Sequence, residues 1–153
     1  MTLPVSGPIS MFNVATELGI TAPAISLNHP WVRALAQIPS GAISMFSLLG
    51  KSGNFAGIGN VIGGAIQMPM PFFGGGTNGV SEVEQTNNGN GTYTIQLFLS
   101  PAPPVYTGNV VLFDSTTGQT VVLTYVSPGN WQNLASQQIL VPGNNSFTLY
   151  PHT

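Results

Sequence analysis

The second half of the chain alternates between apolar and polar residues with a period of two. Residues 92–100 place apolar side chains at every second position from Tyr93 to Leu99, as in a half-buried β-strand. The preceding segment, 87–91, is Asn-Asn-Gly-Asn-Gly, a composition typical of a tight turn. We therefore expect residues 80–86 and 92–100 to pair as a β-hairpin.

Two further hairpins are predicted by the same alternation. Residues 109–114 pair with 119–126, and residues 138–141 pair with 146–150 across a Pro-Gly-Asn-Asn turn. Six or seven short strands at this spacing predict an antiparallel β-sandwich, Ig-like or jelly-roll-like, over residues 80–153. The chain is therefore expected to be mainly β.

The first half of the chain changes to a helical period. Residues 11–18 place Met11, Val14, Ala15 and Leu18 on one side of a helix. Ser10 stands at the N-cap position, where its hydroxyl can accept an unpaired backbone N–H. Gly19 follows the last apolar residue and is expected to end the helix.

A short sequence motif, called the repeated phrase below, occurs twice in this region. Residues 6–13 and 40–47 share Ser-Gly-x-Ile-Ser-Met-Phe, and the second copy predicts another short helix over 45–49, capped by Ser44. Between the copies, residues 28–36 predict a third helix, capped by Asn28 or Ser26, with a proline in its first turn. Two merely similar caps are the alternative interpretation, and six identical residues in the first eight of each copy favour a true repeat over it. Helices this short are marginal alone and need a partner surface.

A glycine-rich apolar segment separates the two halves. Glycine lowers both helix and strand propensity, so residues 54–79 are expected to form an extended arm, or a pair of irregular strands, that packs against a neighbour. The predicted organisation is a short-helix repeat module at 1–53, the arm at 54–79 and the β-sandwich at 80–153.

Charge is scarce along the whole chain. Charged residues make up 4% and the formal net charge is −2, so either copies or partners cover much of the surface, or neutral polar side chains solvate it. Two basic residues are too few for a nucleic-acid interface. The absence of cysteine excludes disulfides and thiolate metal sites. No uninterrupted apolar run approaches about 20 residues, and the N-terminus lacks a signal-peptide pattern, so membrane insertion is not expected.

Candidate catalytic groups are few and scattered. His29 and His152 have no metal-ligand spacing around them. Glu82 and Glu84 share one face of a predicted strand. Their carboxylates would serve a weak cation site or a small hydrolase of the cell wall. A solvated strand face is the favoured interpretation. Gly-Lys-Ser at 50–52 lacks the upstream glycine of a phosphate-binding loop, and no Gly-x-Ser-x-Gly elbow occurs. We therefore expect no enzyme, no catalytic or metal site and no cofactor.

The first third of the chain resembles a module of viral structural proteins. The matching residues are 6–19, 24–28 and 32–52, and the most specific part is Val-Arg-Ala-Leu-Ala-Gln-Ile-Pro-Ser-Gly-Ala-Ile-Ser-Met at 32–45. This pattern resembles a recurrent module in tail and tail-fibre-like proteins of tailed bacteriophages. The resemblance implies a virion component, made in the bacterial host cytoplasm, that assembles with other virion proteins and with copies of itself. Phe12 and Phe46 depart from the polar residues usual in that family.

The functional expectation that follows is a homo-oligomeric tail or tail-fibre-attachment protein acting through assembly contacts. Low charge favours this because few ions need to be desolvated on assembly. A capsid-head decoration protein is the alternative within the same class. The predicted assembly contacts are aromatic residues of the module and the arm: Phe12, Trp31, Phe46, Phe72 and Phe73.

A binding module of another class is the second alternative. In it, Trp131, Tyr106 and Tyr125 of the β-half would bind host-surface glycans. Aromatic residues in a small β-sandwich more often pack in the core or at its rim, so packing is the favoured interpretation of Trp131 and Tyr125.

Overall fold

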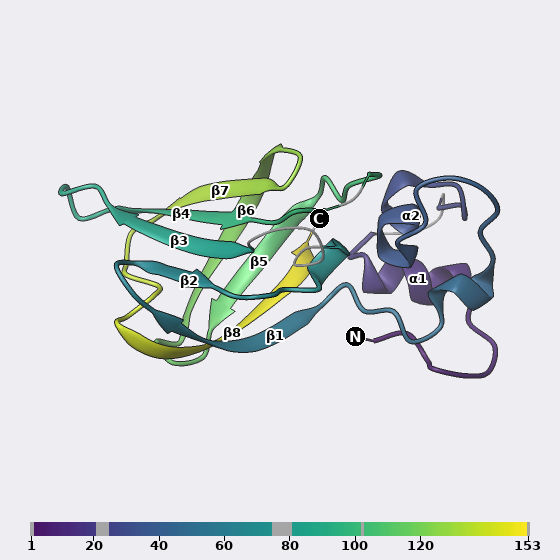
Figure 1. Ribbon diagram of the computed structural model, residues 1–153, viewed down its shortest axis with the longest axis horizontal. Coiled ribbons are helices and arrows are strands. Elements are labelled where there is room, and N and C mark those ends of the chain that lie inside the picture. The colour runs from purple at the N-terminus through teal and green to yellow at the C-terminus, as the bar shows by residue number, and fades with distance from the viewer. Residues whose placement is uncertain (1, 21–24, 75–80, 102, 153) are drawn as a thin grey trace.

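The computed structural model describes residues 2–20, 25–74, 81–101 and 103–152. Three short helical elements lie at one end of a β-body, and the strands extend away from them (Figure 1). Among the described residues, no helix is long and apolar enough to span a membrane. The elements in chain order are α1 (Met11–Glu17), α2 (Pro30–Ala36), η1 (Met45–Leu48), β1 (Phe55–Val61), β2 (Ala65–Gln67), η2 (Phe72–Gly74), β3 (Glu82–Asn87), β4 (Tyr93–Phe98), β5 (Asn109–Asp114), β6 (Gln119–Ser127), β7 (Asn130–Ala135) and β8 (Gly143–His152).

The eight strands form one antiparallel, nearly closed sheet in the order β1-β8-β5-β6-β7-β4-β3-β2. The long strand β6 belongs to both layers, because its first part pairs with β5 and its last part with β7. A single bridge between Ile62 and Ala65 connects β1 to β2 at the open seam. The prediction of a mainly β, sandwich-like fold is confirmed.

The core lies between the two layers of this folded sheet. Side chains from alternate positions of β3, β4, β5, β6, β7 and β8 meet there, as a period of two requires. The inward residues are almost completely removed from solvent. They include Val83, Ile95, Leu97, Leu112, Leu123, Trp131, Phe147 and Leu149.

The glycine-rich segment is built into this sheet. Residues 55–67 were expected to form an extended arm, or a pair of irregular strands, that packs on a neighbour. They form two strands, as the second alternative has it, but β1 pairs with β8 and β2 pairs with β3 of the same chain. The glycines make this possible: a Cβ at Gly59 would collide with the side chain of Ile66, which lies on β2. Residues 75–79 of the predicted arm, and residue 80 of the first predicted strand, lie outside the described residues.

The predicted strand at 138–141 is wrong. This segment is irregular, and side-chain amides take the place of a neighbouring strand. Gln85 Oε1 accepts the N–H groups of Ile139 and Leu140 at 2.8 and 3.0 Å, and buried Asn145 Oδ1 accepts that of Val141 at 3.0 Å. The expected partner of this segment, residues 146–150, lies in β8 and pairs instead with β1 and β5. The strand that follows the second predicted hairpin is β7, which begins at Asn130 and pairs with β4 and β6.

The helix caps are largely as expected. Ser10 Oγ accepts the Asn13 N–H at 3.2 Å, and Asn13 Oδ1 accepts the Ser10 N–H at 2.9 Å, which makes a reciprocal cap for α1. The cap of α2 is His29, whose Nδ1 accepts the Trp31 N–H at 3.2 Å. Neither Asn28 nor Ser26 caps that helix. The last predicted helix is a 3-10 helix, η1, because it is only four residues long.

Three aromatic side chains, Trp31, Phe73 and Tyr106, form a joint between the helices and the sheet. The ring of Tyr106 stacks on Phe73 with a centroid distance of 4.5 Å and lies 4.7 Å from Trp31. Trp31 Nε1 donates to Thr107 Oγ1 at 2.8 Å. Each ring comes from a different part of the chain, so the module at 2–53 packs on the β-body of its own chain.

The tight seam between β1 and β2 gives a first prediction. Gly59→Ala is expected to lower the free energy of unfolding by about 1–3 kcal/mol, as overpacking of a core does, because the new methyl group overlaps Ile66. Ala56→Val lies on the exposed side of the same strand and should stay within about 0.5 kcal/mol. Urea denaturation measures both. Equal stability of the two variants would contradict the close packing of Gly59 on Ile66.

The joint gives a second prediction, in the alkaline range. Burial raises the pKa of the Tyr106 phenol, so above about pH 10 the unfolded chain loses this proton before the folded chain does. The stability that Tyr106 contributes is present below about pH 10 and is lost above it. We expect the free energy of unfolding to fall less steeply above that pH in Tyr106→Phe than in wild type. Identical slopes in Tyr106→Phe and in wild type would contradict the assignment.

Candidate functional site

The two copies of the repeated phrase adopt the same local arrangement. In each copy the serine precedes a helical turn, the methionine packs partly against the core, and the phenylalanine points outward. Phe12 is 69% exposed and Phe46 is 83% exposed. Such exposure is unusual for a side chain of this size. Phe12 and Phe46 are therefore the predicted assembly contacts that the fold leaves available, and they are called the phenylalanine pair below.

The copies also meet each other. A shallow apolar hollow of about 130 Å³ lies where the start of the first phrase faces η1 of the second. Gly50, which follows η1, donates its N–H to the carbonyl oxygen of Pro4 at 2.9 Å and keeps this arrangement closed. No charged side chain lines the hollow. Its lining is Gly7, Pro8, Ile9, Met45, Phe46 and Leu49.

Charge around this apolar surface is minimal. Glu17, the acid of α1, is buried and its Oε1 accepts the Gly53 N–H at 2.7 Å. Arg33 is occupied by the chain itself, donating to Asn28 Oδ1 and to the carbonyl oxygens of Ile38 and Gly41. A partner that covers this surface would therefore not have to desolvate these two ions.

Three of the predicted assembly contacts are used inside the chain. Phe72 and Phe73 are 1% and 4% exposed, so they are not available to a neighbour. They are buried because the short helix η2 turns them under the sheet, where Phe73 stacks on Tyr106. Trp31 is half-buried in the same joint. For these three residues the predicted contact with another subunit is replaced by contact with the chain's own β-body.

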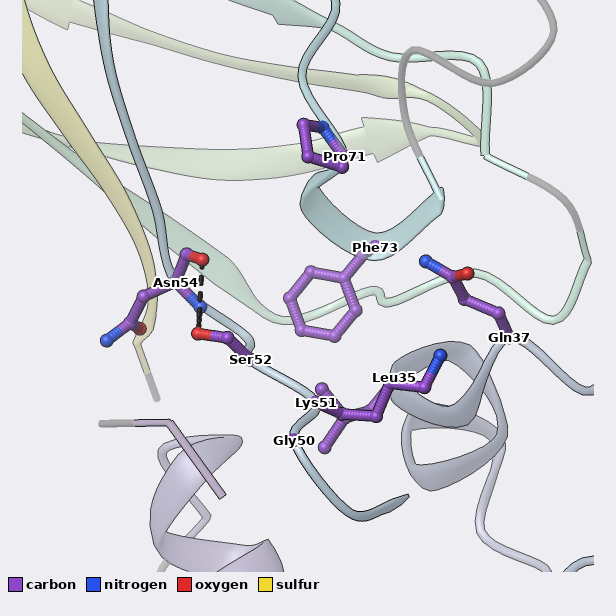
Figure 2. Close-up of a pocket in the computed structure, with 8 residues that line it drawn as sticks. All are labelled: Leu35, Gln37, Gly50, Lys51, Ser52, Asn54, Pro71 and Phe73. Atoms are coloured by element: carbon purple, nitrogen blue, oxygen red, sulfur yellow. Dashed lines mark hydrogen bonds between the residues drawn. The ribbon is translucent and has the colours of Figure 1, made fainter. Parts of the chain in front are cut away.

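A second hollow, of about 190 Å³, lies at the junction of the helices and the sheet. Figure 2 shows Phe73 on its wall, with Lys51 and Gln37 on the side of the helices. Ser52 is held in a local turn, since its Oγ accepts the Asn54 N–H at 3.1 Å and lies 3.2 Å from the Asn54 carbonyl oxygen. Lys51 is the charged residue of the hollow's lining, and Ser52 Oγ also lies 3.3 Å from Glu17 Oε1. We regard the hollow as part of the joint.

The titratable residues singled out from the sequence do not converge. His29 is occupied as a helix cap, and His152 lies exposed at the end of β8. Glu82 Oε1 accepts a hydrogen bond from Gln67 Nε2 at 3.3 Å, on the neighbouring strand β2. Across the described ranges, no group of three or more His, Asp or Glu side chains is placed to hold a metal ion.

The proposed sugar-binding aromatics are mostly internal. Tyr106 and Trp131 are both 0% exposed, and Trp131 Nε1 donates to the Gly108 carbonyl oxygen at 2.9 Å. Tyr125 is half-buried against Trp131, with a centroid distance of 5.7 Å. Tyr106 and Trp131 therefore cannot present a ring face to a glycan, and the expectation of core packing is confirmed for Trp131.

One feature of the apolar surface beside Phe46 was not predicted from the sequence. The phrase drew attention to Phe12 and Phe46 separately, but the hollow arises because Ile9 of one copy and Met45 of the other line the same space. Only the identical spacing of apolar residues in the two copies hinted at this. Val5, 80% exposed, extends the apolar surface next to Gly50.

No family model, curated protein or solved structure matches this chain.

Because both side chains of the phenylalanine pair are exposed, we expect that truncating either ring leaves the free energy of unfolding almost unchanged. Phe12→Ala and Phe46→Ala should each change the free energy of unfolding by no more than about 0.5 kcal/mol, as is usual for surface positions. Phe72→Ala should cost about 3–5 kcal/mol, because it removes a buried ring. Thermal or urea denaturation compares the three. A large loss in either of the first two variants would mean that its ring is part of the core.

Proposed function

We propose that the protein is a structural component of a tailed bacteriophage virion, in the tail or at a tail-fibre attachment, and that it acts through assembly contacts. The observation that carries this proposal is the phenylalanine pair. Phe12 and Phe46 stand at matching positions of a repeated phrase, and both side chains are directed to solvent. The resemblance of residues 6–52 to tail modules of such viruses supports the location.

The energetics favour burial of this surface by a partner. Removing one phenylalanine side chain from water is worth about 1.5–3 kcal/mol, and the apolar hollow beside Phe46 extends the area that a partner can cover. Charges that would oppose burial are scarce, because Glu17 is internal and Arg33 is bound to backbone carbonyls. Burial of a surface without ions avoids the desolvation cost that limits buried salt bridges.

The position of this surface suits an attachment role. The helices occupy one end of the molecule and the strands project from it (Figure 1). The module is fastened to the β-body through Trp31, Tyr106 and Phe73. A partner bound to the phenylalanine pair would therefore hold the β-body at one end, with most of the sheet directed away from the contact.

Particle incorporation tests the proposal. In particles of the encoding phage, mass spectrometry should detect the wild-type chain, whereas the double variant Phe12→Ala, Phe46→Ala should be depleted roughly tenfold or more, equivalent to about 1.4 kcal/mol of binding free energy. Leu134→Ala removes another exposed apolar side chain, on β7, and should be incorporated normally. Absence of the wild-type chain from particles would overturn the virion assignment, and normal incorporation of the double variant would overturn the contact surface.

Light scattering of the purified full chain identifies the partner class. An oligomer that becomes a monomer in the double variant means that copies of the chain meet through the phenylalanine pair. A monomeric wild type assigns the surface to a different virion protein.

A further inference from the structure

The hairpin tip between β3 and β4 carries chemistry that the proposed assembly function does not use. It projects from the end of the β-body opposite the helices (Figure 1), and all five residues from Asn87 to Gly91 are exposed. Two Asn-Gly dipeptides occur in it, Asn88-Gly89 and Asn90-Gly91, and both glycines have positive φ, +74° and +81°.

Asn-Gly dipeptides have an intrinsic reaction of their own. The backbone nitrogen of the glycine can attack Cγ of the asparagine side chain, since no side chain on the glycine blocks the approach. The reaction needs a backbone nitrogen that is free to attack and a Cγ that is electrophilic. The two dipeptides have the same sequence, so the hydrogen bonds around them decide which one reacts.

At Asn90 both requirements are met. Its Oδ1 accepts hydrogen bonds from Thr92 N at 3.1 Å and from Thr92 Oγ1 at 2.6 Å. These two donors polarise the amide carbonyl and stabilise negative charge that develops on Oδ1, as the donors of an oxyanion hole do. The hydrogen bonds found within residues 81–101 do not engage the N–H of Gly91, so this nitrogen is available.

At Asn88 the attacking nitrogen is occupied. The Gly89 N–H donates to Asn87 Oδ1 at 2.9 Å. The side chain of Asn88 is also held at both ends: Nδ2 donates to Thr92 Oγ1 at 3.0 Å, and Oδ1 accepts from Thr94 Oγ1 at 3.2 Å. Attack at this position first requires the bond from Gly89 N to Asn87 Oδ1 to break, and breaking it adds to the barrier.

We propose that Asn90 is a site of spontaneous deamidation in the folded protein. Gly91 N bonds to Asn90 Cγ and gives up its proton to solvent, Nδ2 leaves as ammonia, and a cyclic succinimide results. Water then opens the ring to aspartate or isoaspartate, with no change in oxidation state. Each event replaces a neutral amide by a carboxylate, which takes the formal net charge from −2 to −3. On a chain with four acidic residues, this is a large relative change.

Peptide mapping of the aged full-length protein tests the proposal. The chain is incubated at 37 °C and neutral pH, digested with chymotrypsin, and the peptide ending at Tyr93 is sequenced by tandem mass spectrometry for a gain of about 1 Da per site. We expect deamidation at Asn90 to be on the order of tenfold faster than at Asn88, or about 1.4 kcal/mol in activation free energy. Equal rates in the folded chain, or faster reaction at Asn88, would overturn the proposal.

Two matched controls separate the effect of the fold from that of the sequence. In concentrated urea the hydrogen bonds are lost, so the two rates should become similar; a persistent tenfold difference there would overturn the structural explanation. Asn87→Ala frees the Gly89 N–H and should raise the rate at Asn88 several-fold while Asn90 still reacts. No increase at Asn88 would contradict the role assigned to the bond between Gly89 and Asn87.

Discussion

The stacking of Tyr106 between Trp31 and Phe73 is the contact on which the rest of the molecule depends. The short helices could not persist as isolated segments, and this joint supplies the surface on which they fold. Tyr106 is itself fixed, because its hydroxyl donates to the Asn109 carbonyl oxygen at 3.0 Å. Gly108 completes the joint, since a Cβ there would collide with the Tyr106 ring. The orientation of the helical module therefore follows from one aromatic cluster.

Glycine has a second structural use at the seam of the sheet. Strand β1 presents glycine at two inward positions. The ring of Phe55 occupies the space that a Cβ of Gly57 would take, and the side chain of Ile66 occupies that of Gly59. This brings β1 and β2 close enough for the sheet to close almost completely. Closure matters for a chain with little charge, because unpaired strand edges promote aggregation.

The two ends of the molecule differ in chemistry. At the helical end Phe12 and Phe46 are exposed and no charged side chain lines the hollow beside Phe46, and this is where we propose assembly contacts. At the other end the Asn87–Gly91 tip is polar and neutral until Asn90 reacts. The proposed contact surface and the proposed modification site are therefore far apart, and each can be altered without disturbing the other.

Local features of this protein were determined by the sequence. The Ser10 cap, the strands around Asn109 and Gln119, and the turn at 87–91 follow from hydrogen bonds and side-chain periodicity within a few residues. Long-range features were decided only by the tertiary structure. Phe72 looked like an assembly contact, yet the β-body of its own chain covers it; residues 138–141 looked like a strand, yet amides from Gln85 and Asn145 hold them. A local pattern shows that a residue needs a partner, but the partner is chosen by packing between segments far apart in the chain.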